Sequence, residues 1–293
     1  MIDLFIIPKG RTGGSLLATM LNAHSSISMG YELYPDKLIN DDGTYFTIQI
    51  LANLISSSRL YDSDNLNIKS IKYNNIKTFC ARSARSGITL GDIVNALNFF
   101  NKNTILNNLD SKLDFIDRLL IIQKNKYKKI IVGSKMKVDP YILYKRNPQA
   151  VFLMMVRDGR DVLASRLTNG NFNTNPTECA HDWVNSINDF QNFLRIPKVK
   201  GVFIKYEDLV LNSKKSLSII CELLNIEYEE SMTNYLSRQQ PLFMNSYGQL
   251  SAAQIQDGLN SNSIGKWKRI LSKKDVLTFE MIAREKLIEY RYL

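Results

Sequence analysis

The chain opens with a strand pattern that leads directly into a helix pattern. Residues 2–7 form an apolar run closed by Pro8, which fits a buried parallel strand. A glycine-rich turn follows, and Ser15 then opens a helical spacing of apolar residues at Leu16, Leu17, Met20 and Leu21. Strand, glycine turn and helix in this order form the first half of a βαβ unit.

The same alternation returns in the second half of the chain. Short apolar runs predict three further strands, at residues 130–132, 150–156 and 199–204. Apolar periodicity predicts four further helices, at residues 161–167, 177–194, 213–224 and 273–289. Ser272 is the expected N-cap of the last helix, and Asn212 or Ser213 that of the helix before it. This order predicts an α/β fold with a central parallel sheet flanked by helices.

Residues 33–128 differ from the rest of the chain. They are rich in Asn, Ser and Lys, show mainly helical periodicity and lack strong strand signals. We interpret this stretch as a helical insertion between the first helix and the next core strand. The prediction is therefore one domain over residues 1–293 that carries this insertion.

Composition and charge narrow the class of protein. The 293 residues are 44% hydrophobic, which is enough for a large core, and the formal net charge is +10. Such a charge favours anionic partners, such as a nucleotide, an acidic glycan or a nucleic acid. The basic residues are dispersed, however, without the dense basic helix or the basic–aromatic interleaving expected for nucleic-acid binding.

Cysteine and histidine usage excludes several kinds of site. The cysteines Cys80, Cys179 and Cys221 are widely spaced and contain no CxxC pair, so we expect buried or free thiols in a reducing compartment. With two histidines in the chain, no His-rich metal site is expected. The apolar runs are too short to span a bilayer, and residues 1–7 lack the features of a signal peptide. We therefore expect a cytoplasmic protein.

The glycine-rich turn at residues 10–14 is a candidate anion site. A strand–glycine turn–helix presents backbone N–H groups and a helix N-terminus to one point in space, which attracts phosphate. Compared with a Walker A loop, the sequence places Gly14 where that loop has its lysine, which disfavours a nucleoside triphosphate. Lys9 and Arg11 supply positive charge instead. The alternative is a plain tight turn without a ligand.

Three segments near the N-terminus share a pattern with a known family: Pro8-Lys-Gly-Arg-Thr-Gly-Gly-Ser-Leu-Leu17, Met20-Leu-Asn-Ala-His24 and Gly30-Tyr-Glu32. They resemble the PAPS-dependent sulfotransferases, especially the tyrosylprotein and carbohydrate O-sulfotransferases. PAPS is 3′-phosphoadenosine-5′-phosphosulfate. The resemblance implies a P-loop-like sulfotransferase fold in which the 5′-phosphosulfate is held by Arg11, Thr12, Gly13, Gly14 and Ser15.

A second segment, Val156-Arg-Asp-Gly-Arg-Asp-Val-Leu-Ala-Ser165, resembles the family's 3′-phosphate motif. The resemblance implies that Arg157 and Ser165 bind the 3′-phosphate of adenosine. An arginine at the end of a strand, beside a helix start, is well placed for bidentate phosphate binding. The alternative for this segment is a solvated turn with local ion pairs.

Weaker matches follow in the family's order. Tyr206-Glu-Asp-Leu-Val210 and Ile264-Gly-Lys-Trp267 resemble two further family segments, and the resemblance implies that Tyr206 and Lys266 contact the nucleotide. Tyr206 and Trp267 also fit a role as core anchors. Residues 251–260 would then cover the cofactor. Asn169 stands where the tyrosylprotein type has a further cofactor-binding arginine, so that contact is in doubt.

The resemblance implies transfer of the sulfuryl group of PAPS to an acceptor hydroxyl, with adenosine 3′,5′-bisphosphate as product. Glu32 stands at the position of the family's catalytic glutamate, and we expect it to be the base. Lys135 is the expected catalytic lysine at the leaving group, with Lys137 as a rival that the sequence does not separate from it. His24 and His181 are expected to be structural. No metal is expected.

The acceptor cannot be derived from the residues alone. The resemblance favours a sugar hydroxyl of a glycan or glycolipid first and a peptide tyrosine second, with a small molecule as a third choice. We expect residues 33–128, most of which are not matched by the resemblance, to determine the acceptor. The alternatives to a sulfotransferase are a P-loop kinase and a non-enzymatic basic nucleic-acid-binding protein.

Overall fold

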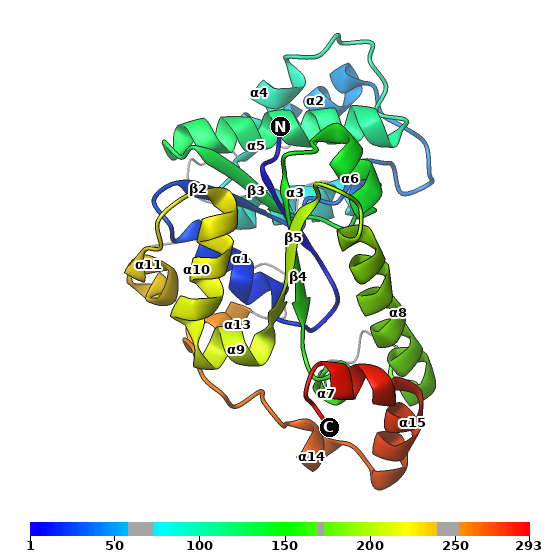
Figure 1. Ribbon diagram of the computed structural model, residues 1–293. Helices are drawn as coiled ribbons and strands as arrows, with labels where there is room; N and C mark the ends of the chain where they lie inside the picture. The colour runs from blue at the N-terminus through cyan, green and yellow to red at the C-terminus, as the bar shows by residue number, and fades with distance from the viewer. Residues whose placement is uncertain (58–72, 169–172, 239–251) are drawn as a thin grey trace. The chain divides into compact units, whose positions relative to one another are not determined.

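A sheet of five parallel strands organises the fold (Figure 1). The computed structural model describes residues 1–57, 73–168, 173–238 and 252–293. The strand order is β2-β3-β1-β4-β5, and the strands are β1 (Leu4–Ile7), β2 (Ile27–Tyr31), β3 (Ile131–Lys135), β4 (Val151–Val156) and β5 (Lys200–Lys205). This architecture confirms the predicted α/β fold with a central parallel sheet flanked by helices.

Strand β4 shows why the apolar runs form the centre of the sheet. All six of its residues, Val-Phe-Leu-Met-Met-Val, are buried, as expected for a strand covered on both faces. It pairs in parallel with β5, with Val151 opposite Lys200 and Val156 opposite Lys205. The register therefore brings the ends of both strands to the same edge of the sheet, next to Arg157 and Tyr206 in the sequence.

Strand β2 was not predicted from the sequence. Ser28 and Gly30 interrupt its apolar pattern, yet all five of its residues are buried. It pairs in parallel with β3, from Ile27 opposite Ile131 to Tyr31 opposite Lys135. A Cβ on Gly30 would lie 2.7 Å from Leu120 Cδ2, so the missing side chain is what lets the neighbouring helix pack closely. Close packing around β2 requires small residues at some of its positions. A search for continuous apolar runs therefore misses this strand.

The chain divides into two compact units. The first unit comprises residues 1–5, 18–138 and 229–252, and the second comprises residues 6–17, 139–228 and 253–293. The boundary crosses strand β1 and the first helix, α1 (Gly14–Asn22).

Helices surround strands β2 and β3 in the first unit. Helix α5 (Leu109–Lys126) packs on both strands, and α3 (Asn74–Arg85) packs on β2. The other helices of this unit are α2 (Ile48–Ser57), α4 (Leu90–Leu97), α11 (Glu230–Thr233) and the 3₁₀ turns η1 (Pro35–Lys37) and η3 (Tyr235–Ser237). Within residues 33–128, the described elements are helical apart from an isolated antiparallel bridge between Thr47 and Ile105.

The second unit contains β4, β5 and a series of helices. These are α6 (Pro140–Arg146), α7 (Gly159–Leu167), α8 (Pro176–Leu194), α9 (Tyr206–Leu211), α10 (Ser213–Leu224), α13 (Ala252–Gln256), α14 (Trp267–Ile270) and α15 (Lys273–Glu289). Helix α15 packs along α8 and also touches α7 (Figure 1). Ser272 caps α15 as predicted, because its hydroxyl accepts from the Asp275 amide. Asn212 precedes α10 but makes no side-chain cap bond.

Aromatic packing joins α8 to strands β4 and β5. Phe193 of α8 packs edge-on against Phe152 of β4 with ring centres 4.8 Å apart, and Phe190 packs against Phe203 of β5 at 4.9 Å. Edge-to-face pairs at these distances stabilise a core beyond the burial of their surface. They hold α8 in a fixed position against β4 and β5.

The cysteines are buried thiols, and no helix within the described ranges has both the length and the apolar character needed to cross a membrane.

Gly159, the first residue of α7, gives a test of this packing. A Cβ at Gly159 would lie 2.4 Å from Phe279 Cζ and 2.8 Å from Trp183 Cδ2. We expect Gly159→Ala to lower the free energy of unfolding by about 1–3 kcal/mol, because the added methyl overpacks the contact between α7, α8 and α15. Urea unfolding measures this change. An unaltered midpoint would contradict the prediction, because it would show that the rings of Phe279 and Trp183 can shift without a loss of stability.

Candidate functional site

The turn between β1 and α1 is shaped by two residues with left-handed backbone. Arg11 has φ of 70° and Gly13 has φ of 97°, and a Cβ on Gly13 would lie 2.5 Å from Tyr206 Cδ2. Glycine is therefore required at position 13 both by conformation and by the close approach of the tyrosine ring. Strain of the kind seen at Arg11 persists where the surrounding structure enforces it, often at binding sites.

Hydrogen bonds close this turn and start the helix. Thr12 is buried and its hydroxyl donates to the Lys9 carbonyl at 2.9 Å. The Leu17 amide donates to the Gly13 carbonyl at 3.1 Å, which sets the first turn of α1. The N–H groups at the start of α1 have no partner inside their own helix, so this end of α1 suits an anion.

The two predicted phosphate motifs meet at this turn. Arg11 Nε donates to Ser165 Oγ at 2.9 Å, and Arg157 Nη1 donates to the Arg11 carbonyl at 3.1 Å. Arg11 lies in the glycine turn, whereas Arg157 follows β4 and Ser165 lies on α7. The structure thus brings residues separated by about 150 positions into one site, and all of them belong to the second unit.

Arg157 is buried, and its contact with a carboxylate is long. Its side chain is 7% exposed, and its pair with Asp161 spans 4.0 Å. Its Nη2 donates to the Ser263 carbonyl, and its Nε has no hydrogen-bond partner in the part of the chain that the structure describes. The guanidinium lies 4.7 Å from the centre of the Tyr206 ring. A buried charge that is held mainly by carbonyls and a ring, with its carboxylate partner 4.0 Å away, can still attract an anion.

The charge of Arg157 also acts on the neighbouring Arg11. The pKa of Arg11 is lowered, first by burial of the guanidinium and second by the charge of Arg157. Two neighbouring cations that repel one another gain from a shared anion, and a dianionic phosphate offers such a partner. The electrostatics of this site therefore favour a phosphorylated ligand.

Arg160, three residues after Arg157, has a structural role instead. It is buried and donates to Asp158 through Nε at 3.0 Å and Nη2 at 2.8 Å, and to Glu280 at 2.6 Å. It also bonds the Tyr292 carbonyl at 2.7 Å. The local ion pairs considered for this segment are thus present, but they are buried in the core of the second unit rather than solvated.

Two further residues predicted to contact the nucleotide, Lys266 and Ser15, belong to the same unit as the turn. Lys266 Nζ donates to Thr168 Oγ1 at 3.3 Å, just beyond the end of α7. Trp267 is half-exposed, and the Arg160 guanidinium lies 4.1 Å from its ring centre. Ser15 is half-exposed in the first turn of α1, next to the buried Gly14. These positions are compatible with ligand contact from several elements of one unit.

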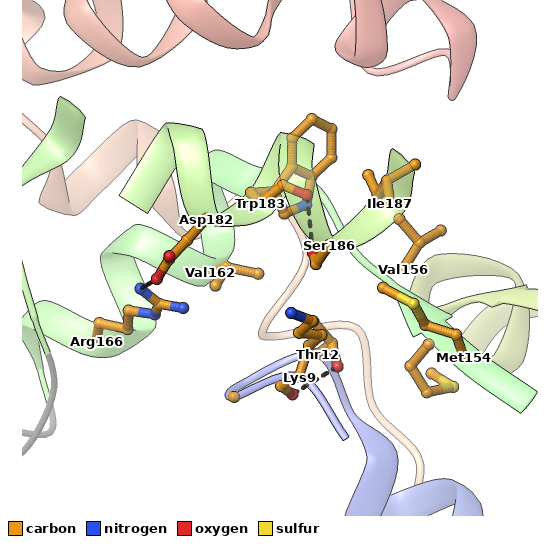
Figure 2. A pocket seen from close by; sticks show the side chains of 12 residues that line it. Lys9, Thr12, Met154, Val156, Val162, Arg166, Asp182, Trp183, Ser186 and Ile187 are labelled. Atoms are coloured by element: carbon orange, nitrogen blue, oxygen red, sulfur yellow. Dashed lines mark hydrogen bonds and ion pairs between the residues drawn. The ribbon is translucent and has the colours of Figure 1, made fainter. Parts of the chain in front are cut away.

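A cavity lies beside the glycine turn (Figure 2). Lys9 and Thr12 line one side, and Trp183, Ser186 and Ile187 of α8 line the other. Met154 and Val156 of β4 complete an apolar wall. Arg166 lies at its edge and pairs with Asp182 at 3.5 Å. The lining of the cavity thus mixes apolar side chains with the polar side chains of Lys9, Thr12, Arg166, Asp182 and Ser186.

Glu32 lies in a second charged cluster, which belongs to the first unit. Lys135 Nζ donates to Glu32 Oε1 at 2.6 Å, while Arg85 Nη1 and Arg82 Nε lie 3.7 and 3.9 Å from Oε2. The Glu32 amide donates to the Lys135 carbonyl at 2.9 Å, so the end of the β2–β3 ladder fixes both backbones. Lys137, the rival of Lys135, is exposed.

The cations determine the protonation of Glu32. Burial raises the pKa of this carboxyl, but the charge and hydrogen bond of Lys135, together with Arg82 and Arg85, outweigh burial and lower the pKa below its ordinary value. Glu32 is therefore ionised at neutral pH and able to accept a proton.

Arg82 and Arg85 were missed by sequence reasoning. They lie in the last turn of α3, within the stretch that matches no family motif. Their spacing of three residues places them on one face of the helix, but that pattern is common on solvated helices. Arg82 also stacks 4.4 Å from the centre of the Tyr34 ring. Only the packing of α3 on β2 reveals that this face meets Glu32.

Other positions named from the sequence fall outside the charged clusters. His24 is buried and its Nδ1 accepts from the Ser26 amide, whereas His181 is exposed on α8. Asn169 and the beginning of the proposed covering loop, Ser251, lie outside the described residues. Among the side chains that the structure describes, no group of three or more His, Cys, Asp or Glu could hold a metal ion.

Comparison with known proteins gives a family match over part of the chain. Residues 140–230 match the model of the Sulfotransferase family, a range that contains Arg157, Ser165 and Tyr206. The chain has no match among the curated proteins.

Two solved structures resemble the whole chain. The sulfotransferase domain from the Synechococcus PCC 7002 olefin synthase has 19% sequence identity and a TM-score of 0.59, over 97% of this chain and 94% of that domain. The sulfotransferase domain from the curacin biosynthetic pathway has 17% identity and a TM-score of 0.53, over 96% of both chains. At this level of identity, the likeness shows that the chain has the fold of these sulfotransferase domains.

Proposed function

We propose that this protein is a sulfotransferase that moves the sulfuryl group of PAPS to an acceptor hydroxyl. The observation that carries the proposal is the contact between the two anion-binding motifs, in which Arg11 bonds Ser165 and Arg157 bonds the Arg11 backbone. A ligand with phosphates at both ends fits such a site better than a ligand with one. The family match over residues 140–230 supports the same function.

The proposed nucleotide site uses residues of the second unit. The 5′-phosphosulfate is held by the turn residues Arg11, Thr12, Gly13, Gly14 and Ser15, with Lys9 adding charge. Arg157 and Ser165 bind the 3′-phosphate, Lys266 adds a further cation, and Tyr206 holds Arg157 and Gly13 in position by packing against both. The N-terminus of α1 supplies backbone N–H groups to the 5′-phosphosulfate.

The transfer itself requires a base and a cation. A bond forms between the acceptor oxygen and sulfur while the bond from sulfur to the bridging phosphate oxygen breaks, and adenosine 3′,5′-bisphosphate leaves. We assign Glu32 as the base that takes the hydroxyl proton and Lys135 as the cation that stabilises the leaving oxygen. Their direct contact at 2.6 Å favours Lys135 over the exposed Lys137.

The acceptor proposed first is a sugar hydroxyl of a glycan or glycolipid, and a peptide tyrosine is second. Incubation with radiolabelled PAPS and a panel of both, with small phenols included, tests the function. Label transfer to an acceptor is the expected result. Magnesium-dependent binding of ATP without binding of PAPS would contradict the proposal and indicate a kinase.

Substitution of Arg157 tests the 3′-phosphate assignment. We expect Arg157→Ala to weaken the binding of adenosine 3′,5′-bisphosphate by roughly 30-fold or more, because a charge-assisted phosphate contact is lost from a buried site. Binding of adenosine 5′-monophosphate should fall by much less. Titration calorimetry measures both affinities, with Arg195→Ala at the exposed end of α8 as the matched control. Equal losses for the two ligands would remove Arg157 from the 3′-phosphate site.

Substitution of Glu32 tests the base. We expect Glu32→Gln to lower kcat by at least about 100-fold, since the amide cannot accept the proton, while nucleotide affinity stays close to that of the unaltered protein. Glu222→Gln, at an exposed position of α10, is the control. Full turnover by the Glu32 variant would refute the assignment.

The pH profile tests the role of Arg82. Glu32 works in its ionised form, which is present above its pKa and is lost as the pH falls through it. Because Arg82 helps to lower this pKa, we expect Arg82→Gln to raise it and to move the acid limb of kcat/KM upward by roughly one pH unit. Lys102→Gln, an exposed change in the same unit, should leave the limb unmoved. An acid limb that stays in place in the Arg82 variant would mean that another group sets it.

A further inference from the structure

Asp161 is a fully buried carboxylate in the first turn of α7. Its Oδ2 accepts from the Gly265 amide and its Oδ1 from the Trp267 amide, both at 2.8 Å. Each oxygen therefore bonds one N–H of the same short segment, more than 100 residues further along the chain. Charge-assisted bonds of this length are among the strongest in proteins.

This segment contributes to the surroundings of Arg157 at two points. Arg157 Nη2 donates to the Ser263 carbonyl, and Lys266 lies between the two amides that Asp161 holds. Gly265 has φ of 70°, a conformation that favours glycine and that the bond to Asp161 fixes. Two backbone amides of residues 263–267 thus bond Asp161 of α7, and the Ser263 carbonyl of the same segment accepts from Arg157.

The bonds of Asp161 also affect how far the charge of Arg157 is neutralised. The carboxylate lies 4.0 Å from Arg157 Nη2, too far for a good hydrogen bond, and its two oxygens each accept from a backbone amide at 2.8 Å. Arg157 in turn bonds carbonyls. The guanidinium is therefore held in place without being tightly neutralised, which leaves it able to attract a phosphate.

We propose that Asp161 is a positioning residue for the nucleotide site, which fixes residues 263–267 so that Ser263 orients Arg157 and Lys266 faces the 3′-phosphate. This inference rests on the proposed function, since it deepens the assignment of that phosphate. Asp161 itself touches no ligand in this proposal. Its effect is on how well the site distinguishes a nucleotide with a 3′-phosphate from one without.

The chemistry of the carboxylate predicts a graded series of variants. In Asp161→Asn the side-chain amide retains one acceptor oxygen and nearly the same volume, so one of the two backbone amides keeps a neutral bond. Asp161→Ala loses both bonds. Asp208→Asn, at an exposed position of α9 in the same unit, is the matched control.

The experiment combines calorimetry with hydrogen exchange on these variants. We expect Asp161→Asn to weaken the binding of adenosine 3′,5′-bisphosphate roughly tenfold and Asp161→Ala to weaken it further, with adenosine 5′-monophosphate affected by less than about threefold. Peptides over residues 263–267 should exchange faster in both variants, while peptides from β4 and α8 keep the exchange of the unaltered protein. The Asp208 control should match the unaltered protein in both measurements.

Two results would overturn the inference. Equal weakening of both nucleotides would show that Asp161 supports the fold in general, and unchanged exchange over residues 263–267 would show that it does not hold that segment. Failure of the unaltered protein to bind the bisphosphate would overturn the proposed function instead, and the exchange measurement would still decide whether Asp161 fixes the segment.

Discussion

The site depends on a buried arginine that keeps its charge. Arg157 is held by the carbonyls of Arg11 and Ser263 and by the ring of Tyr206, and within the described residues no short carboxylate bond neutralises it. Removing a cation from water is costly unless a partner offsets the loss, so an anion bound beside Arg157 would offset part of this cost. The glycine turn, β4 and the segment at residues 263–267 all converge on this one group.

The segment at residues 157–161 shows how burial gives two arginines different roles. Arg160 has Asp158 and Glu280 as close partners, so its charge is neutralised inside the protein and stabilises the fold. Arg157 has neither. The acid that faces it, Asp161, bonds backbone amides instead. A segment with two arginines and two aspartates could form two short internal ion pairs. Here one such pair forms, and the second arginine remains available to a ligand.

The sequence predicted the sheet well where the strands are continuously apolar, as in β4, and missed β2, where Ser28 and Gly30 break the run. The two candidate phosphate motifs could be identified from the sequence because each is local, with the arginine and its helix adjacent in the chain. Arg82, Arg85 and the bonds of Asp161 could not, because their importance comes from contacts across long stretches of sequence. No periodicity or spacing encodes which face of α3 meets Glu32.

The Glu32 cluster has a consequence for how the proposed base works. Three cations around one carboxylate keep it ionised, but they also make it a weaker base than an isolated glutamate, because a lowered pKa means a lower proton affinity. In the proposed mechanism, the contact between Lys135 and Glu32 would therefore have to loosen as Glu32 takes the hydroxyl proton. The proposed base and cation would then act as a coupled pair, and the ends of β2 and β3 hold both of their backbones in register.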